Sequence, residues 1–135
     1  MTVTLLTPAG LPQTPTHHQV SVATGTRTVH VAGQVAIDEH GETVGVGDLG
    51  AQVEQVHRNL LAALASAGAT FDDVVRLTLY MVDMRPETLG PAVEALLRTR
   101  EAMGVTAAPP LTGIGVSALA SPDYLLEIEA VAVLP

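Results

Sequence analysis

The chain contains no cysteine, no lysine and no tryptophan, and each absence excludes a kind of chemistry. Without cysteine it has no thiolate nucleophile and no disulfide, and without lysine it has no Schiff-base catalysis. The six basic residues, all arginines, stand against 14 acidic ones, so the net charge is −8. Neither nucleic acid nor an anionic membrane surface is an expected partner, because both attract basic proteins. Two tyrosines and one phenylalanine also offer few stacking platforms for bases.

Membrane-spanning and metal-binding patterns are missing as well. No apolar run approaches the roughly 20 residues that cross a bilayer, and no cationic stretch followed by an apolar one opens the sequence. We therefore expect a cytoplasmic protein. The five histidines show no H-x-H or H-E-x-x-H spacing, so we expect no metal site. They are His17, His18, His30, His40 and His57.

The length of 135 residues fits one domain, residues 1–135. A composition of 47% hydrophobic and 15% charged residues is that of a chain that folds. A domain of this size leaves about a third of its chain surface exposed, so such an apolar chain is expected to form a homo-oligomer. The alternative is that the excess reflects only a bias toward alanine and valine.

Apolar periodicity and turn residues predict seven elements in the order β-β-α-β-α-β-β. The expected elements are strands 19–23 and 28–35 as a hairpin, helix 48–67, strand 72–82, helix 86–103, and strands 112–119 and 124–133. Asp48 is the expected cap of the first helix and Gly68 its stop, while Pro86 opens the second helix and Gly104 closes it. The segment 8–15, rich in proline, glycine and threonine, is expected to cross the surface as a covering arm.

These elements define an α+β fold in which a mixed sheet carries two helices on one face. The strand 72–82 is apolar on both of its faces, as an interior strand requires. The opposite face of the sheet has no helix to cover it. We expect another subunit to bury its apolar side chains.

Two carboxylates lie on one face of the last strand. Glu127 and Glu129 alternate with Ile128 among apolar neighbours. Carboxylates held in such surroundings are suited to general acid/base catalysis, and Glu127 is the strongest single candidate. The alternatives are that they are edge-strand charges that prevent aggregation, or partners of Arg76 or Arg100.

Gly33 precedes Gln34 at the end of the strand 28–35. A residue without a Cβ at this place lets a ligand or a backbone approach closely, which predicts a binding role. The alternative is a β-bulge that bends the strand.

Together these features resemble the Rid family of reactive intermediate deaminases, also called the YjgF family, along nearly the whole chain. The resemblance rests on Ala32-Gly33-Gln34, the helix from Gln52 to Gly68, the strand from Asp72 to Asp83, and Glu127-Ile128-Glu129. It implies a chorismate-mutase-like fold, a homotrimer, and small-molecule clefts between the subunits. Active members of the family hydrolyse enamines or imines to a 2-oxo acid and ammonia without a metal or cofactor.

The resemblance also implies roles for single residues. The first glutamate of the last strand, here Glu127, handles the attacking water, and Gly33 is kept in the cleft. The family's arginine, which clamps the substrate carboxylate, is replaced by Leu111, a departure that argues against 2-aminoacrylate as the substrate. Thr112 and Gly113 occupy the two positions after it, and His17 stands where the family has a tyrosine.

Three readings of the function therefore remain open at this level. In the first, the chain is an enzyme that transforms an imine or enamine less acidic than the usual substrates, with Glu127 as the catalytic group and Leu111 as an apolar wall. In the second, it is a non-catalytic trimeric module that binds a small molecule or a partner protein. A different reaction placed in the same cleft is a third reading, since a fold does not determine function. The sequence does not show whether Arg98, Arg100 or His18 reaches the cleft.

Overall fold

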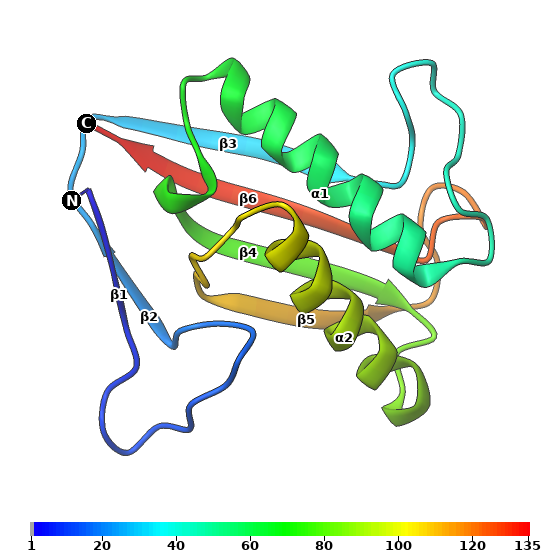
Figure 1. Ribbon diagram of the computed structural model, residues 1–135, viewed down its shortest axis with the longest axis horizontal. Coiled ribbons are helices and arrows are strands. Elements are labelled where there is room, and N and C mark those ends of the chain that lie inside the picture. The colour runs from blue at the N-terminus through cyan, green and yellow to red at the C-terminus, as the bar shows by residue number, and fades with distance from the viewer. Residues whose placement is uncertain (1) are drawn as a thin grey trace.

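The framework of the molecule is a four-stranded sheet, seen in the ribbon of Figure 1. A computed structural model describes residues 2–135. Its elements are β1 (Val3–Leu6), β2 (Val20–Ala23), β3 (Arg27–Gln34), α1 (Leu49–Ser66), the 3-10 turn η1 (Phe71–Asp73), β4 (Val74–Val82), α2 (Pro86–Ala102), β5 (Leu111–Val116) and β6 (Leu126–Leu134).

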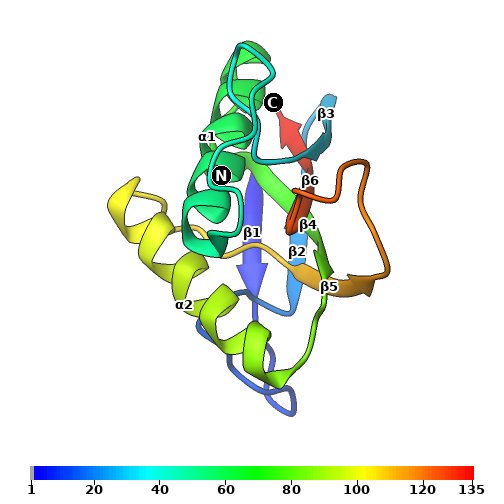
Figure 2. The ribbon, with the colours of Figure 1, turned by 90° about the vertical axis from the view of Figure 1, so that its right-hand side faces the viewer.

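The sheet is mixed, and both helices cover the same face of it. The strand order is β3-β6-β4-β5, with β4 and β5 parallel and the other neighbours antiparallel. Figure 2 shows α1 and α2 together on one side of the sheet. Strands β1 and β2 form a separate two-stranded sheet. The predicted α+β class, with a mixed sheet and two helices on one face, is confirmed.

The core lies between the helices and the sheet. In β6 the side chains that face the helices are buried, whereas those on the other face are only partly buried. Helix α1 contributes Val53, Val56, Leu60 and Leu64, all at most 1% exposed and spaced three or four residues apart. This spacing brings them onto one helix face, which packs against the sheet. The uncovered face of the sheet carries the polar side chains discussed below.

The predicted helix boundaries are confirmed. The Asp48 side chain accepts a hydrogen bond from the backbone N–H of Ala51 at 3.0 Å, which caps α1. Gly68 follows the end of α1 with a φ of +78°, a conformation that side chains with a Cβ rarely adopt. Pro86 opens α2, and Gly104 follows its end with a φ of +69°.

The predicted hairpin of residues 19–23 and 28–35 is wrong. Strand β2 pairs with β1, and β3 pairs with β6. The strands themselves are close to their predicted ranges, because alternating β-branched residues indicate where a strand lies. They do not indicate which strand it pairs with, and this is why the hairpin was predicted wrongly. The loop at Gly25 turns the chain toward β6, and a Cβ there would lie 2.2 Å from the Leu134 carbonyl oxygen. Strand β1 was not predicted from the sequence, although its side chains alternate between more and less buried positions.

Candidate functional site

An apolar cavity of about 270 Å³ lies between α2 and the strands β4 and β5. Most of its wall is aliphatic or methionine side chains: Leu79, Met84, Leu89, Ala92, Val93, Leu96 and Leu111. Gly113 from β5 and the pair Thr16 and His17 complete it. A mostly apolar cavity with one or two polar groups is typical of a small-molecule site.

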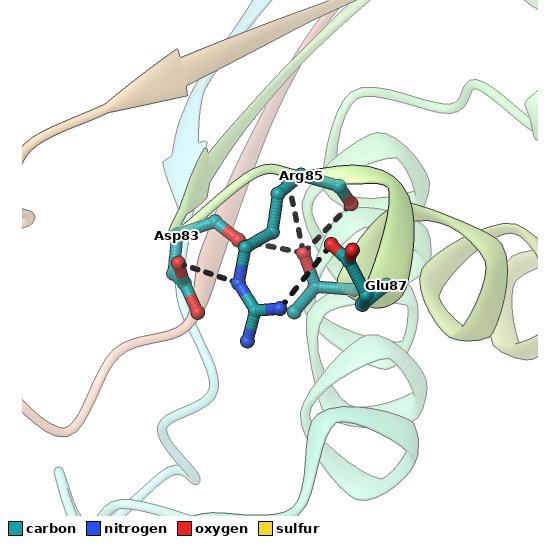
Figure 3. A network of polar contacts seen from close by, with 4 residues as sticks. Asp83, Arg85 and Glu87 are labelled. Atoms are coloured by element: carbon teal, nitrogen blue, oxygen red, sulfur yellow. Dashed lines mark hydrogen bonds and ion pairs between the residues drawn. The ribbon is translucent and has the colours of Figure 1, made fainter.

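The turn between β4 and α2 places two of these wall residues, Met84 and Leu89. Figure 3 shows Arg85 between two carboxylates: its Nε donates to Asp83 Oδ1 at 3.0 Å and its Nη1 to Glu87 Oε2 at 3.3 Å. Asp83 has a φ of 55°, which is uncommon for a residue with a side chain. The Thr88 hydroxyl donates to the Asp83 carbonyl at 2.6 Å. These contacts define the turn, although ion pairs this exposed contribute little to stability.

The segment between β1 and β2 supplies the polar part of the wall. The Thr16 hydroxyl and His17 Nδ1 are hydrogen bonded at 2.8 Å. His18 is tied to the loop before β5, where its backbone N–H donates to the Ala108 carbonyl at 2.8 Å. Burial lowers the pKa of His17 below its usual value, with smaller contributions from the charge of Arg100 and from His18. The imidazole in the cavity wall is therefore neutral at neutral pH.

The two predicted carboxylates lie on the opposite, uncovered face of the sheet. Glu127 and Glu129 are partly buried, and the Tyr80 hydroxyl donates to Glu129 Oε1 at 2.5 Å. This hydrogen bond is the main reason why the pKa of Tyr80 is raised. Both alternatives from the sequence are wrong: β6 lies between β3 and β4, so it is no edge strand, and neither carboxylate forms an ion pair with an arginine in the described chain.

Gly33 and Glu127 are in direct contact across β3 and β6. A Cβ on Gly33 would lie 2.1 Å from Glu127 Oε2, closer than any real contact. The pairing of β3 with β6 also shifts register between Val31 and Gln34. Both predictions for Gly33 therefore apply at the same place: another group approaches its Cα closely, and the strand pairing is irregular there. The group that approaches Gly33 is the Glu127 carboxylate.

A single chain does not bring all the predicted site residues together. His17, Leu111 and Gly113 line the cavity on the helix side of the sheet. Glu127, with Gly33 beside it, belongs to the uncovered face. Thr112 also faces that side, where its hydroxyl accepts a hydrogen bond from Arg76 Nη2 at 3.0 Å. Strand alternation explains the division, because Leu111 and Gly113 are paired with Leu77 and Leu79 while Thr112 is paired with Thr78.

Neither arginine that the sequence left undecided lines this cavity. Arg98 lies in a separate groove between α1 and α2. Arg100 is 4% exposed and does not line the cavity, but its side chain donates a hydrogen bond to the carbonyl of the wall residue Thr16. His18 is also absent from the lining. Over residues 2–135, no cluster of three metal-binding side chains is found, and no helix is long and apolar enough to cross a membrane.

Apart from Leu111, the residues that make the cavity apolar were not predicted from the sequence. Met84 and Leu89 come from the turn and the first part of α2, and nothing in their spacing distinguishes a cavity wall from an ordinary helix face. Leu89 is 43% exposed, and a single exposed leucine is common on protein surfaces, so it gave no signal. Pro86, the first residue of α2, was the sequence feature nearest to these two residues, and it predicted only where the helix begins.

The fold and this division of polar and apolar residues define an α+β domain with an apolar cavity and an open sheet face. A family model described as Endoribonuclease L-PSP matches residues 12–134. With that match and the relatives that follow, the chain belongs to the Rid family, also known as the RutC or YjgF family. The family predicted from the sequence is confirmed.

Relatives of this chain include proteins of known structure and one of named activity. The RutC family protein YjgH of Escherichia coli K12 is 33% identical over 98% of this chain and 95% of its own length. The structure of YyfB from Yersinia pestis, a Rid protein of unknown function, matches with a TM-score of 0.90 and 38% identity, covering 99% of this chain and 100% of its own. The 2-iminobutanoate/2-iminopropanoate deaminase of Mus musculus is 28% identical over 70% of this chain and 73% of its own length.

Proposed function

We propose that the chain hydrolyses a small imine or enamine in a site shared between subunits of a homotrimer. The observation that carries the proposal is the division of the site residues between two faces of the sheet. The cavity with His17 and Leu111 and the carboxylate of Glu127 cannot meet within one chain. A second copy that covers the open face of the first would join them.

The open face has the composition that such an interface needs. Ile114 on β5 is 42% exposed on this face. Val131 and Val133 on β6 are partly buried on the same face as Glu127. Exposed apolar patches that are rimmed by polar residues are typical of protein interfaces. The chain's high apolar content is consistent with the same conclusion.

The proposed chemistry needs only water and one carboxylate. Glu127 accepts a proton from a water molecule while the water oxygen bonds to the carbon of the C=N group. The carboxyl returns this proton to nitrogen, which gives a carbinolamine. Glu127 then removes the proton of the new hydroxyl group and transfers it to the amine nitrogen, so the C–N bond breaks and a carbonyl product and ammonia leave. An enamine enters the same route after it takes up a proton at carbon to become the imine. The Mus musculus relative, by its name, acts on imines.

The proposed substrate class follows from the cavity wall. No arginine lines the cavity in the part of the chain that the structure describes. A charge-assisted hydrogen bond contributes about 1.5–3 kcal/mol, so a substrate carboxylate would lose that much affinity here. The aliphatic wall with Leu111 favours an imine with an apolar substituent and no carboxylate. The family description names a ribonuclease, but a chain of net charge −8 and few aromatic residues is poorly suited to RNA.

A non-catalytic binding module of the same trimeric fold is the second candidate. The observation that favours it is the same leucine at position 111, because a cavity without the clamp can retain a ligand-binding role after losing catalysis. In that case Glu127 serves the contact with Gly33 and the subunit interface.

The test is the release of ammonia and of the carbonyl product from imines generated in place by an amino-acid oxidase and by an amine oxidase. The variants are Glu127→Gln and Leu111→Arg, with Glu39→Gln as the control, since it removes a carboxylate from a remote exposed turn. We expect native turnover, highest on apolar imines without a carboxylate, a loss of about a hundredfold or more in Glu127→Gln, and no change in the control.

Three outcomes contradict parts of the proposal. Full activity in Glu127→Gln excludes the catalytic role of that residue. A silent native chain with activity gained in Leu111→Arg favours the binding module. A monomeric mass near 13.9 kDa by light scattering, in place of three times that value, excludes the shared site.

A further inference from the structure

Arg100 is a buried cation that forms no ion pair within residues 2–135. The residue is 4% exposed, and its Nε and Nη2 atoms have no hydrogen-bond partner among residues 2–135. Burial lowers its pKa to about 10. Two contacts compensate in part: the guanidinium lies 5.7 Å from the centre of the Phe71 ring, and Arg100 is in the last turn of α2, where the helix dipole favours a positive charge. Burying an unpaired charge costs free energy of folding. If residue 100 served only to fill the core, an apolar side chain would stabilise the fold more than arginine does.

The one hydrogen bond that the Arg100 side chain makes within residues 2–135 leads to the cavity wall. Its Nη1 donates to the Thr16 carbonyl at 2.5 Å. Thr16 in turn holds His17, through the 2.8 Å hydrogen bond between the Thr16 hydroxyl and His17 Nδ1. The Thr14 and Thr16 hydroxyls are 2.8 Å apart, which stiffens the same short segment. Arg100, Thr16 and His17 therefore form a continuous path from helix α2 to the cavity.

His17 is the single titratable side chain that lines the cavity in the described part of the chain. Its Nδ1 is used by Thr16, so Nε2 is the ring nitrogen left for a ligand. The charged or titratable groups that act on it are Arg100 from α2 and His18 from its own segment, and the facing strands β4 and β5 contribute only Leu79, Leu111 and Gly113 to this wall.

We propose that Arg100 is a positioning residue that fixes the segment 14–18 against helix α2 and so presents His17 to the cavity. It acts through the Thr16 carbonyl and touches no ligand itself. The part of this inference that concerns a ligand rests on the proposed function, because an imine N–H is the group that His17 Nε2 would accept. The positioning of the segment stands without it.

The proposal predicts two effects of removing the guanidinium. The amides of Thr14 and of residues 16–18 lose their anchor, so their hydrogen exchange becomes faster. The positive charge that disfavours protonation of His17 disappears, so the pKa of His17 rises toward its ordinary value of 6.5. A substitution that only loosened the core would accelerate exchange in α1 and β6 as well.

The experiment uses Arg100→Met, Arg100→Gln and Arg100→Lys, with Arg98→Met as the matched control on the same helix. Hydrogen exchange by mass spectrometry follows residues 14–18 relative to α1, and the NMR titration of the His17 ring reports its pKa. In the two neutral variants we expect exchange to rise by about tenfold in 14–18 alone and the His17 pKa to rise. Arg100→Lys should restore both toward native, and Arg98→Met should change neither.

An unchanged His17 titration or unchanged exchange in either neutral variant that folds would overturn the proposal. Equal acceleration across α1 and the segment would also overturn it, because it would show a general loss of stability. These readouts require no turnover. A protein without imine hydrolysis that shows both effects thus refutes the proposed function alone, and an active one that shows neither refutes the role of Arg100 alone.

Discussion

Acid should destabilise this protein through one buried histidine, His57. Its side chain is 1% exposed in the middle of α1, and it stacks near Phe71 with ring centres 6.4 Å apart. Nδ1 donates to the Val53 carbonyl at 2.8 Å, whereas Nε2 has no partner within residues 2–135. Burial lowers the pKa of His57 from 6.5 to about 4. A proton on this ring would be a second unpaired charge near Arg100.

The sign of the effect follows from which state takes up the proton. Above pH 6.5 the ring is neutral in both states, and stability does not depend on it. Between pH 6.5 and about 4 the unfolded chain is protonated and the folded one is not, so the free energy of unfolding falls as the pH falls. Each pKa unit corresponds to about 1.4 kcal/mol, so between pH 6.5 and about 4 the free energy of unfolding falls by about 3 kcal/mol in total.

The assay is urea unfolding at a series of pH values from about 7 to 4. The variant His57→Leu removes the titrating group and keeps an apolar side chain of similar size. Native and variant curves should converge or cross as the pH falls, with the difference changing by about 3 kcal/mol. His40→Gln, at an exposed turn, should follow the native curve. A difference between native and His57→Leu that stays constant with pH would refute the reasoning.

Two further predictions concern the core and the uncovered face. Leu60→Ala, at a position that is 0% exposed in α1, should lower the free energy of unfolding by about 3 kcal/mol in urea titrations, whereas Leu6→Ala, at 44% exposure, should cost far less. Gly33→Ala should leave the fold intact but force the Glu127 carboxylate aside, so it should reduce imine turnover as Glu127→Gln does. Native turnover in folded Gly33→Ala would show that the observed place of Glu127 is not the working one.

Local signals in the sequence determined most of the fold. The Asp48 cap, Gly68 and the three- and four-residue spacing of α1 act over short distances, and a single helix satisfies all of them. Strand pairing is different in kind. The residues of β3 alternate in the same way whether the strand pairs with β2 or with β6, and only packing across the whole sheet decides. The hairpin prediction failed for this reason.

The candidate site shows the same contrast. Glu127 and Gly33 were predicted separately, from a carboxylate in an apolar strand and from a missing Cβ, and the structure places them in contact. The buried state of Arg100 and the cavity wall from Met84 and Leu89 could not be predicted, because they depend on how α2 lies across the sheet. The division of the site between two faces became visible only once the register of β5 was known.

The position of β6 has a consequence for how the molecule is made. This strand comes last among the described elements, yet it lies between β3 and β4 and joins them. A ribosome therefore releases β3, α1, β4 and α2 before the segment that links the two halves of the sheet has been synthesised. Until residues 126–134 emerge, both halves hold unpaired backbone groups and exposed apolar faces, which is the condition that chaperones recognise. The nascent chain should remain open to proteases until then and close in one late step.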